Sequence, residues 1–155
     1  MKISEVELEN FLNAANKATY ANKAAPKSAS LRPSSEDYHF EQGDLIYHDT
    51  YFGTRDFLGE EVVYKTKKPV WGMNYYGYIL SPDVSTKEVY EILRSALMQE
   101  YSDILPVRGP RNYAEGTSAY ENQVDGNLDR FSGEERIYFK EELVYRCWYH
   151  GGNIE

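Results

Sequence analysis

Apolar residues recur with a helical spacing in two stretches of the chain. In the first, Leu8 and Phe11 begin an apolar stripe, and Glu7 follows Ser4 at the spacing of a capping box. The second, residues 81–101, has a capping-box spacing of its own and a stripe of the same kind. The pattern therefore predicts two amphipathic helices, and each must pack its stripe against another element.

Each helical stretch is followed by segments rich in aromatic and β-branched residues, which favour strands. The Asp125-Gly126 pair is predicted to form a hairpin turn in the second half of the chain. Residues 21–36 contain two prolines and many small polar side chains, which predicts a flexible loop. The predicted strands are residues 37–42, 44–52, 57–66 and 69–80, and then 117–124, 127–131, 134–140 and 143–152.

The second half of the chain repeats part of the first. Residues 57–79 align with residues 131–153 without a gap, and 8 of the 23 positions are identical, where about one or two would match by chance. The helical stretches align at an offset of 81, which places Tyr20 over Tyr101. Two amphipathic hairpins could resemble each other through patterning alone, but the shared Phe-x-Gly-Glu-Glu favours a duplication. The identical pairs are Phe57/Phe131, Gly59/Gly133, Glu60/Glu134, Glu61/Glu135, Tyr64/Tyr138, Val70/Val144, Tyr75/Tyr149 and Gly77/Gly151.

These patterns predict an α+β fold made of two related halves, about residues 4–80 and 85–154, each a helix followed by antiparallel strands. Neither half can bury its apolar face alone, so the halves are expected to pack together as one two-layer domain over residues 1–155. A chain of 155 residues can build such a core without a disulfide or a metal. The boundary between the halves is where a ligand is expected.

Composition and charge narrow the classes of function. The net charge of −8 argues against direct binding to nucleic acid, because that affinity rests on clustered Lys and Arg. Acidic residues interrupt the first 20 residues, where a signal peptide needs an apolar stretch, and no apolar run approaches the roughly 20 residues of a membrane span. The chain is therefore expected to be cytoplasmic, without membrane contact. Cys147 is the single cysteine, so no disulfide within the chain is predicted.

One face of the predicted sheet carries the most promising mixture of side chains. Side chains alternate between the two faces of a strand, so Asn74 and Tyr76 point away from the apolar face, and Arg146, Trp148 and His150 do the same in the last strand. Aromatic rings combined with an amide, a guanidinium and an imidazole suit an amphipathic small molecule. These five residues form the candidate ligand site, although a solvated sheet face would show the same pattern.

Arg108 and Arg111 flank a rigid Gly-Pro turn and complete the candidate site as a clamp for a ligand carboxylate or phosphate, although such arginines commonly pair with acids of their own chain. Each Gly-Glu-Glu presents one carboxylate to each face of the sheet, and the sequence leaves open which one faces the core. No catalytic residue is assigned, since the chain has no nucleophile motif, P-loop or dinucleotide fingerprint. The three histidines have no recognisable partner cluster, so neither a metal nor a cofactor is predicted.

Four segments resemble a bacterial and archaeal domain family of unknown function: FLGEEVVY, KPVWGMNYYG, RGPRNY and VYRCWYHGG. The likeness runs from the first helix to Gly152. Members of that family occur alone or behind an XRE-type helix-turn-helix domain, which implies an association with transcription regulators. The resemblance implies no catalytic residue, because the family has no established activity. The domain accounts for all 155 residues, so no helix-turn-helix and no DNA binding are expected here.

Three functions remain open from the sequence. The first is a non-enzymatic module that senses a ligand or a partner. The second is an uncharacterised hydrolase or isomerase that uses His150 with a carboxylate. The third is a protein–protein interaction module, which would dock another chain or form a homodimer. The patterns favour the first, with a small molecule as ligand, and leave the ligand's identity and the oligomeric state open.

Overall fold

The computed structural model describes residues 3–155 and contains one helix followed by four strands, twice. Met1 and Lys2, the first two residues of the predicted domain, lie outside this described part. The elements are α1 (Glu5–Ala18), β1 (Glu36–Gln42), β2 (Leu45–Gly53), β3 (Asp56–Lys65), β4 (Lys68–Ile79), α2 (Thr86–Leu97), β5 (Asn112–Glu115), β6 (Ser118–Asn127), β7 (Arg130–Phe139) and β8 (Glu142–Asn153).

The eight described strands form one antiparallel sheet with the order β1-β2-β3-β4-β8-β7-β6-β5. The first four strands make one side of the sheet and the last four make the other. The sides meet where β4 pairs with β8, from Trp71 opposite Asn153 to Ile79 opposite Tyr145. The predicted α+β class with antiparallel strands is confirmed, and the boundary between the two sides is a continuous hydrogen-bonded strand pair.

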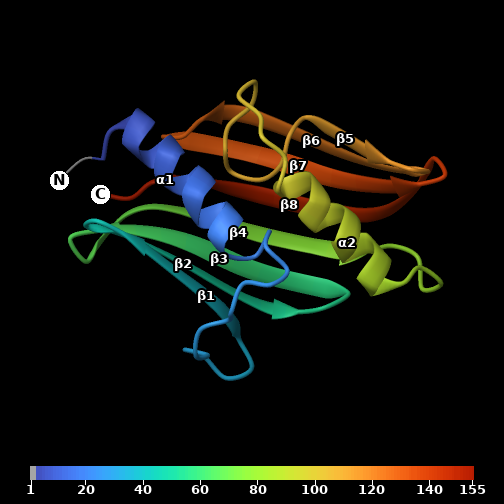
Figure 1. The fold of residues 1–155 in the computed structure, drawn as a ribbon, viewed down its shortest axis with the longest axis horizontal. Helices are drawn as coiled ribbons and strands as arrows, with labels where there is room; N and C mark the ends of the chain where they lie inside the picture. Colours follow the sequence, from blue (N-terminus) through green and yellow to red (C-terminus); the bar gives the residue numbers. More distant parts are fainter. Residues whose placement is uncertain (1–2) are drawn as a thin grey trace.

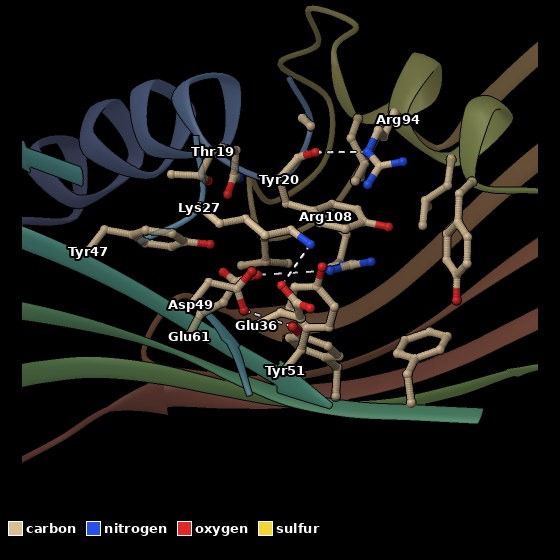
Figure 2. Close-up of a pocket in the computed structure, with 18 of the residues that line it drawn as sticks. Thr19, Tyr20, Lys27, Glu36, Tyr47, Asp49, Tyr51, Glu61, Arg94 and Arg108 are labelled. Carbon is tan, nitrogen blue, oxygen red and sulfur yellow. Dashed lines mark hydrogen bonds and ion pairs between the residues drawn. The ribbon is translucent and has the colours of Figure 1, made fainter. Parts of the chain in front are cut away.

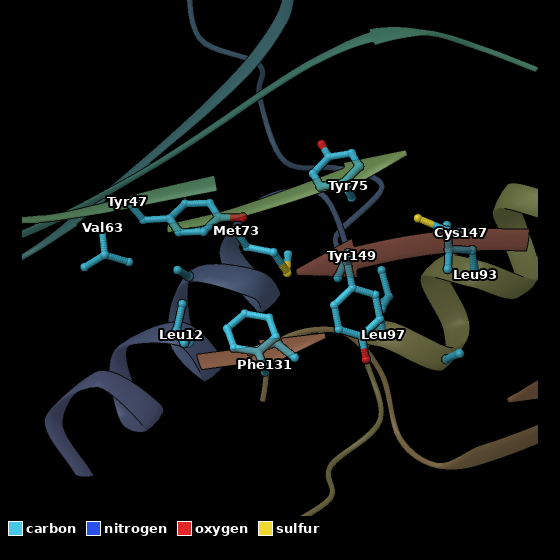
Figure 3. Packing of buried hydrophobic residues seen from close by; sticks show 14 of the residues in the cluster. Leu12, Tyr47, Val63, Met73, Tyr75, Leu93, Leu97, Phe131, Cys147 and Tyr149 are labelled. Atoms are coloured by element: carbon cyan, nitrogen blue, oxygen red, sulfur yellow. The ribbon is translucent and has the colours of Figure 1, made fainter. Parts of the chain in front are cut away.

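Both helices lie over the same face of the sheet (Figure 1). α1 contacts β1 and β2, whereas α2 contacts β5, β6 and β7. The apolar stripes of both helices are buried in one cluster with the sheet. Figure 3 shows Leu12 of α1 and Leu93 and Leu97 of α2 among sheet residues such as Phe131 and Cys147. We call this side of the sheet the covered face and the opposite side the open face.

The helix starts follow the sequence prediction. The Ser4 hydroxyl accepts a hydrogen bond from the backbone N–H of Glu7 at 3.2 Å, which satisfies one of the free donors at the start of α1. Ser85 occupies the N-cap position of α2, but its side chain makes no capping hydrogen bond. Among residues 3–155, no helix combines the length and the apolar character that a membrane span requires.

The predicted turn at Asp125-Gly126 is wrong. Both residues lie within β6, and the chain reverses two residues later, at Leu128 and Asp129. The side-chain oxygen of Asn127 accepts a hydrogen bond from the backbone N–H of Asp129 at 3.1 Å, which stabilises this turn. The predicted strand 127–131 consequently spans the turn, and its last two residues join most of 134–140 in the single strand β7. The short edge strand β5 was not predicted at all.

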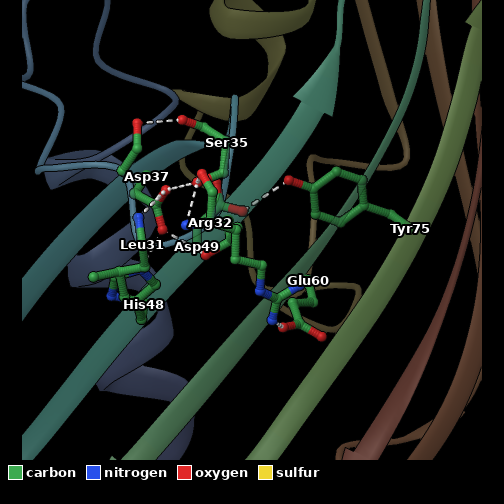
Figure 4. A network of polar contacts seen from close by, with 10 residues as sticks. Leu31, Arg32, Ser35, Asp37, His48, Asp49, Glu60 and Tyr75 are labelled. Carbon is green, nitrogen blue, oxygen red and sulfur yellow. Dashed lines mark hydrogen bonds and ion pairs between the residues drawn. The ribbon is translucent and has the colours of Figure 1, made fainter.

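The segment between α1 and β1, residues 19–35, contains no helix or strand apart from a single bridge between Ser28 and Asp37. Figure 4 shows Asp37 beside Leu31 and Ser35 of this segment. The Asp37 carboxylate accepts hydrogen bonds from the Leu31 backbone N–H at 3.3 Å and from the Thr50 hydroxyl of β2 at 2.7 Å. Burial acts to raise the pKa of Asp37, but hydrogen bonds from Ser35, from His48 and from Thr50 outweigh it and lower the pKa to about 2. The network anchors this segment to β1 and β2.

Candidate functional site

The structure brings five of the seven predicted site residues together on the open face. Asn74 lies directly opposite His150 on β4 and β8, and Tyr76 lies opposite Trp148. The Arg146 guanidinium stands 5.3 Å from the centroid of the Trp148 ring. Tyr76 is 48% exposed and Trp148 is 42% exposed, so both rings are accessible rather than core. They stand on the central strands, at the boundary between the two sides of the sheet.

The two predicted arginines lie elsewhere. Arg108 is buried on the covered face, where its Nη2 lies 2.8 Å from Oε2 of Glu135. Arg111 is exposed and contacts Asp103, to whose backbone carbonyl it donates hydrogen bonds. Neither therefore joins the residues of the open face.

A cavity of about 250 Å³ lies on the covered face, over the first side of the sheet (Figure 2). β2, β3 and β4 form its floor. Its walls are the end of α1, α2, the segment before β1, and Val107 and Arg108 from the segment between α2 and β5. The cavity has the concave, partly aromatic character of small-molecule sites. The aromatic residues that line it are Tyr20, Tyr47, Tyr51, Phe57, Tyr75 and Tyr90.

Two carboxyl groups stand side by side on the cavity floor. Asp49 on β2 is directly paired with Glu61 on β3, and both side chains face the cavity. They are almost fully buried, with 2% and 4% of their surface exposed. The Tyr75 hydroxyl donates a hydrogen bond to Oδ1 of Asp49 at 2.7 Å, whereas Oε2 of Glu61 has no hydrogen-bond partner within residues 3–155. Burial acts to raise the pKa of Glu61 and the Tyr47 hydroxyl acts to lower it, but no donor in the described part of the chain reaches Oε2 in hydrogen-bond geometry. A buried carboxylate oxygen without such a donor is costly, which favours the protonated form of Glu61.

The nearest cation does not balance both groups. Nη1 of Arg108 is 3.9 Å from Oε1 of Glu61, but the same guanidinium is engaged more closely with Glu135. Burial raises the pKa of Asp49 well above its usual range, against the opposing effects of Tyr75 and Arg108. Burial also raises the pKa of Glu61, and the neighbouring Asp49 carboxyl reinforces that effect. Both groups consequently bind protons at pH values where exposed carboxyls are ionised.

The other side of the sheet carries a matching set of residues. A Cβ placed on Gly59 would lie 2.3 Å from the hydroxyl oxygen of Tyr75, and a Cβ on Gly133 would lie at the same distance from that of Tyr149. Both tyrosines pass over a glycine of the neighbouring strand to reach the strand beyond. The Tyr149 hydroxyl donates to Oδ1 of Asn122 at 2.6 Å, as Tyr75 does to the aspartate. The corresponding pairs are Tyr47/Tyr120, Asp49/Asn122, Glu61/Glu135 and Tyr75/Tyr149.

On that second side, the chain itself occupies the space above the floor. Arg108, Gly109 and Pro110, from the segment between α2 and β5, are buried there. The Gly109 backbone N–H donates to the Tyr120 hydroxyl at 3.1 Å, and its carbonyl accepts from Asn122 Nδ2 at 2.9 Å. The Tyr120 hydroxyl in turn donates to Glu135 at 2.6 Å. Each polar group of the second floor thus has a partner from its own chain.

The sequence interpretation missed the cavity, although it contained a signal for it. The sequence left open which glutamate of each Gly-Glu-Glu faces inward, and the structure turns Glu61 and Glu135 toward the helices. The gapless alignment began at Phe57 and therefore stopped short of β2 and β6. These two strands match at an offset of 73 instead of 74, with Tyr47 over Tyr120 and Asp49 over Asn122. Allowing one inserted residue in the turn would have revealed the Tyr-x-Asp and Tyr-x-Asn pair.

Within the described part of the chain, no group of three or more His, Cys, Asp or Glu side chains is arranged to hold a metal ion. Cys147 is buried, and burial raises the pKa of its thiol to about 12. It packs as a small apolar residue of the core, as its position among Tyr145 and Tyr149 predicted.

Comparisons with known proteins bear on the family. No curated protein and no solved structure matches the chain. A family model described as Domain of unknown function (DUF5680) matches residues 49–154, which begins at the cavity aspartate and extends through β8. The expectation of a family of unknown function is confirmed, whereas the association with helix-turn-helix regulators stays a prediction. Because the matched residues make up more than half of the chain, the protein belongs to the DUF5680 family.

Proposed function

We propose that this protein is a non-enzymatic binding module that senses a small organic molecule in the cavity over β2, β3 and β4. The observation that carries the proposal is Oε2 of Glu61, which has no donor in hydrogen-bond geometry among residues 3–155, on the floor of a cavity of about 250 Å³. A cavity of 150 Å³ already holds benzene in an engineered protein, so this one has room for a ring with a polar substituent. The proposal keeps the expected cytoplasmic location and the expected relation to domains attached to transcription regulators.

The proposal includes an internal duplication that formed one two-layer domain. Its support is local geometry that recurs at the offset of the sequence repeat. The pairing register of β3 with β4 shifts after Val63, and that of β7 with β8 shifts after Ile137. The two hairpin turns that follow have positive φ at non-glycine residues: 48° and 65° at residues 66–67, and 48° and 70° at residues 140–141. A duplication explains why both floors carry the same polar set, and divergence of the connecting segments explains why one is filled.

The enzymatic alternative has less support. His150 has Asn74 and Ser132 as its cross-strand neighbours on the open face. The two carboxyls with raised pKa face the opposite side of the sheet. The glutamates that share the open face with His150 are held in ion pairs: Glu60 with Arg32, and Glu134 with Arg136 and Arg146.

A second candidate function, self-association, rests on a different observation. Leu58, Tyr76 and Trp148 form a row across β3, β4 and β8, with exposed fractions of 52%, 48% and 42%. A row of large apolar side chains is what a sheet-face interface uses. Sedimentation equilibrium of the wild-type protein and of Tyr76→Ser tests this function: a dimer that the substitution dissociates supports it, and a wild-type monomer at about 100 μM contradicts it.

The test of the binding proposal is a thermal-shift screen of a metabolite library, followed by mapping of each hit on backbone amide NMR spectra. A ligand at 100 times its dissociation constant adds about 2.7 kcal/mol of apparent stability, which such a screen detects. We expect hits that shift the amide signals of Tyr47, Asp49 and Tyr75, with little change at Tyr76 and Trp148. Hits that map only to the open face, or a library without any hit, would contradict the cavity as the binding site.

A further inference from the structure

The chemistry of the cavity floor indicates which class of ligand it takes; this inference rests on the proposed binding function. Three buried carboxyl groups, Asp49, Glu61 and Glu135, surround one buried guanidinium. Arg108 lies 2.8 Å from Glu135 and 3.9 Å from Glu61, so its charge is committed mainly to the second side. The cavity floor therefore has one partly committed guanidinium, Arg108, as the cation for its two carboxyl groups.

The remaining charged groups of the wall do not fill this role. Lys27 makes an ion pair with Glu36 at 2.7 Å. The Arg94 Nε donates to the Tyr20 backbone carbonyl at 3.2 Å, and its guanidinium lies 4.6 Å from the centroid of the Tyr20 ring. Figure 2 shows Arg94 on the helix side of the cavity, away from the two carboxyls on the sheet.

On the second side of the sheet, the corresponding polar groups all have hydrogen-bond partners, and these partners indicate what the first side requires. There, the Gly109 backbone N–H donates a hydrogen bond to the Tyr120 hydroxyl, and the Arg108 guanidinium donates one to the Glu135 carboxylate. The position of Asp49 is taken by Asn122, an amide without charge. The first side has an additional carboxyl, no backbone donor corresponding to Gly109, and Arg108 only at 3.9 Å from Glu61. Within the described residues, what it lacks is a group at hydrogen-bond distance that is both an N–H donor and positively charged.

The aromatic wall suits the same group. Cations are attracted to the faces of aromatic rings, and tyrosine is among the rings that bind them. Arg108 already places its guanidinium 5.3 Å from the centroid of the Tyr75 ring, at the edge of the cavity. Tyr47 and Tyr51 supply further rings beside the carboxyls.

We propose that the cavity binds an organic cation, an ammonium or amidinium group on a single apolar ring, with Glu61 and Asp49 as its counter-charges. The charged end would donate hydrogen bonds to Oε2 of Glu61 and to the Asp49 carboxylate. Because the pKa of each carboxyl is raised, binding near neutral pH would also release to the solvent the protons that the two groups hold. The ring would lie among the tyrosines. Hydrogen bonds between two charged groups are the strongest of their kind in a site withdrawn from water.

The test compares benzamidine with benzamide, which share size and shape but differ in charge, by isothermal titration calorimetry. The variants are Glu61→Gln and Asp49→Asn, which keep side-chain volume, and Asp49→Asn also reproduces the residue found on the second side. Glu60→Gln is the matched control, because Glu60 is the neighbouring glutamate on the open face, paired with Arg32. Circular dichroism establishes that each variant is folded.

We expect the wild type and Glu60→Gln to bind benzamidine at least about tenfold more tightly than benzamide, and Glu61→Gln and Asp49→Asn to lose about tenfold or more of that affinity. Equal affinity for the two compounds, or unchanged binding in both cavity variants, would overturn the cation assignment. If the metabolite screen yields only neutral or anionic ligands that map to the cavity, the binding function stands and the cation assignment fails. If neither the screen nor benzamidine gives binding in the cavity, both fail.

Discussion

The two sides of the covered face present corresponding polar positions to the interior, yet they are completed in different ways. Over β6, β7 and β8, the chain sends Arg108 and Gly109 down onto the floor, and every polar group there finds a partner. Over β2, β3 and β4, the segment 19–35 is instead held to β1 and β2 by Asp37, and a cavity is left open. The difference is that the chain itself fills the space over one floor, whereas the other floor lines a cavity.

A single exchange of residue type accompanies this difference. The Asn122 amide donates a hydrogen bond to the Gly109 backbone carbonyl and accepts one from the Tyr149 hydroxyl. Asp49, when ionised, can only accept, and its one tyrosine donor leaves the remaining acceptor capacity unused. The amide therefore matches a floor that is filled by backbone, whereas the carboxyl leaves acceptor capacity on the floor of the cavity.

The largest loss of stability is expected from a substitution on the second floor, over β6, β7 and β8. Arg108→Met should lower the free energy of unfolding by about 3–5 kcal/mol, because it leaves Glu135 buried without its cation. Arg111→Met is the matched control on the same segment, and its exposed position predicts a change within about 0.5 kcal/mol. Urea denaturation of both variants measures the difference. Equal stability of the two would show that the second floor does not depend on the guanidinium.

The next effect is a pH dependence of stability, and it arises from the two carboxyl groups on the cavity floor. The pKa values of Asp49 and Glu61 are raised to about 7 and about 8 in the folded protein, above their unfolded values of about 3.9 and 4.3. The folded state therefore holds more protons, so this stabilisation is complete below about pH 4 and is lost as pH rises through 7 and 8. The charged and titratable groups that face the pair are Tyr47, Tyr75, Asp37, Arg108 and Glu135.

The measurement is the free energy of unfolding of the wild type and of Glu61→Gln between about pH 5 and pH 9. The wild type should lose up to about 1.4 kcal/mol per pH unit relative to the variant, which has no carboxyl to deprotonate at that position. If the wild type and Glu61→Gln changed in stability by the same amount per pH unit, Glu61 would already be ionised in the protein without ligand. Glu60→Gln should follow the wild-type profile.

A smaller effect compares the two glycines under the tyrosine rings. A Cβ at Gly59 or at Gly133 would lie 2.3 Å from ring atoms of Tyr75 or Tyr149, and 2.7 Å from a backbone carbonyl in either case. Alanine should therefore cost about 1–3 kcal/mol at both positions. Gly59→Ala should cost less, because Tyr75 can shift into the cavity while Tyr149 is held in filled space. A greater loss for Gly59→Ala in thermal denaturation would contradict the difference in packing.

The smallest effect is expected on the open face. Trp148→Ala should cost less than about 1 kcal/mol and leave ligand binding in the cavity unchanged, because the ring is 42% exposed. Trp71→Ala is the contrasting variant: that ring is fully buried against Phe131, and its loss should cost about 3–5 kcal/mol. If Trp148→Ala abolished binding instead, the site would lie on the open face, among the residues that the sequence singled out.

Much of this fold could be predicted from the sequence, because it follows from local patterns. The Ser4 cap, the two apolar stripes and the alternation of Trp71, Met73 and Tyr75 with Asn74 and Tyr76 depend on neighbours in the chain. The alternation also placed the five predicted residues on one face, and strand pairing then brought them together.

The cavity could not be found in this way, because it depends on two connecting segments without regular structure. No local pattern indicates that residues 105–111 turn inward to fill one floor while residues 19–35 leave the other open. The placement of Arg108 illustrates this: the sequence shows an arginine beside a Gly-Pro turn, and only the packed chain shows that it faces Glu135 rather than solvent. The inward direction of Glu61 likewise required the pairing register of β2 with β3.

The measurement that tests the central claim most directly is a crystal structure of the protein grown with benzamidine at about pH 8. We expect an amidinium within hydrogen-bond distance of Glu61 and Asp49, with its ring among Tyr47, Tyr51 and Tyr75 and with Gly109 in place on the second floor. A first floor that is closed by residues 19–35, with Glu61 paired to a group of its own chain, would contradict the claim.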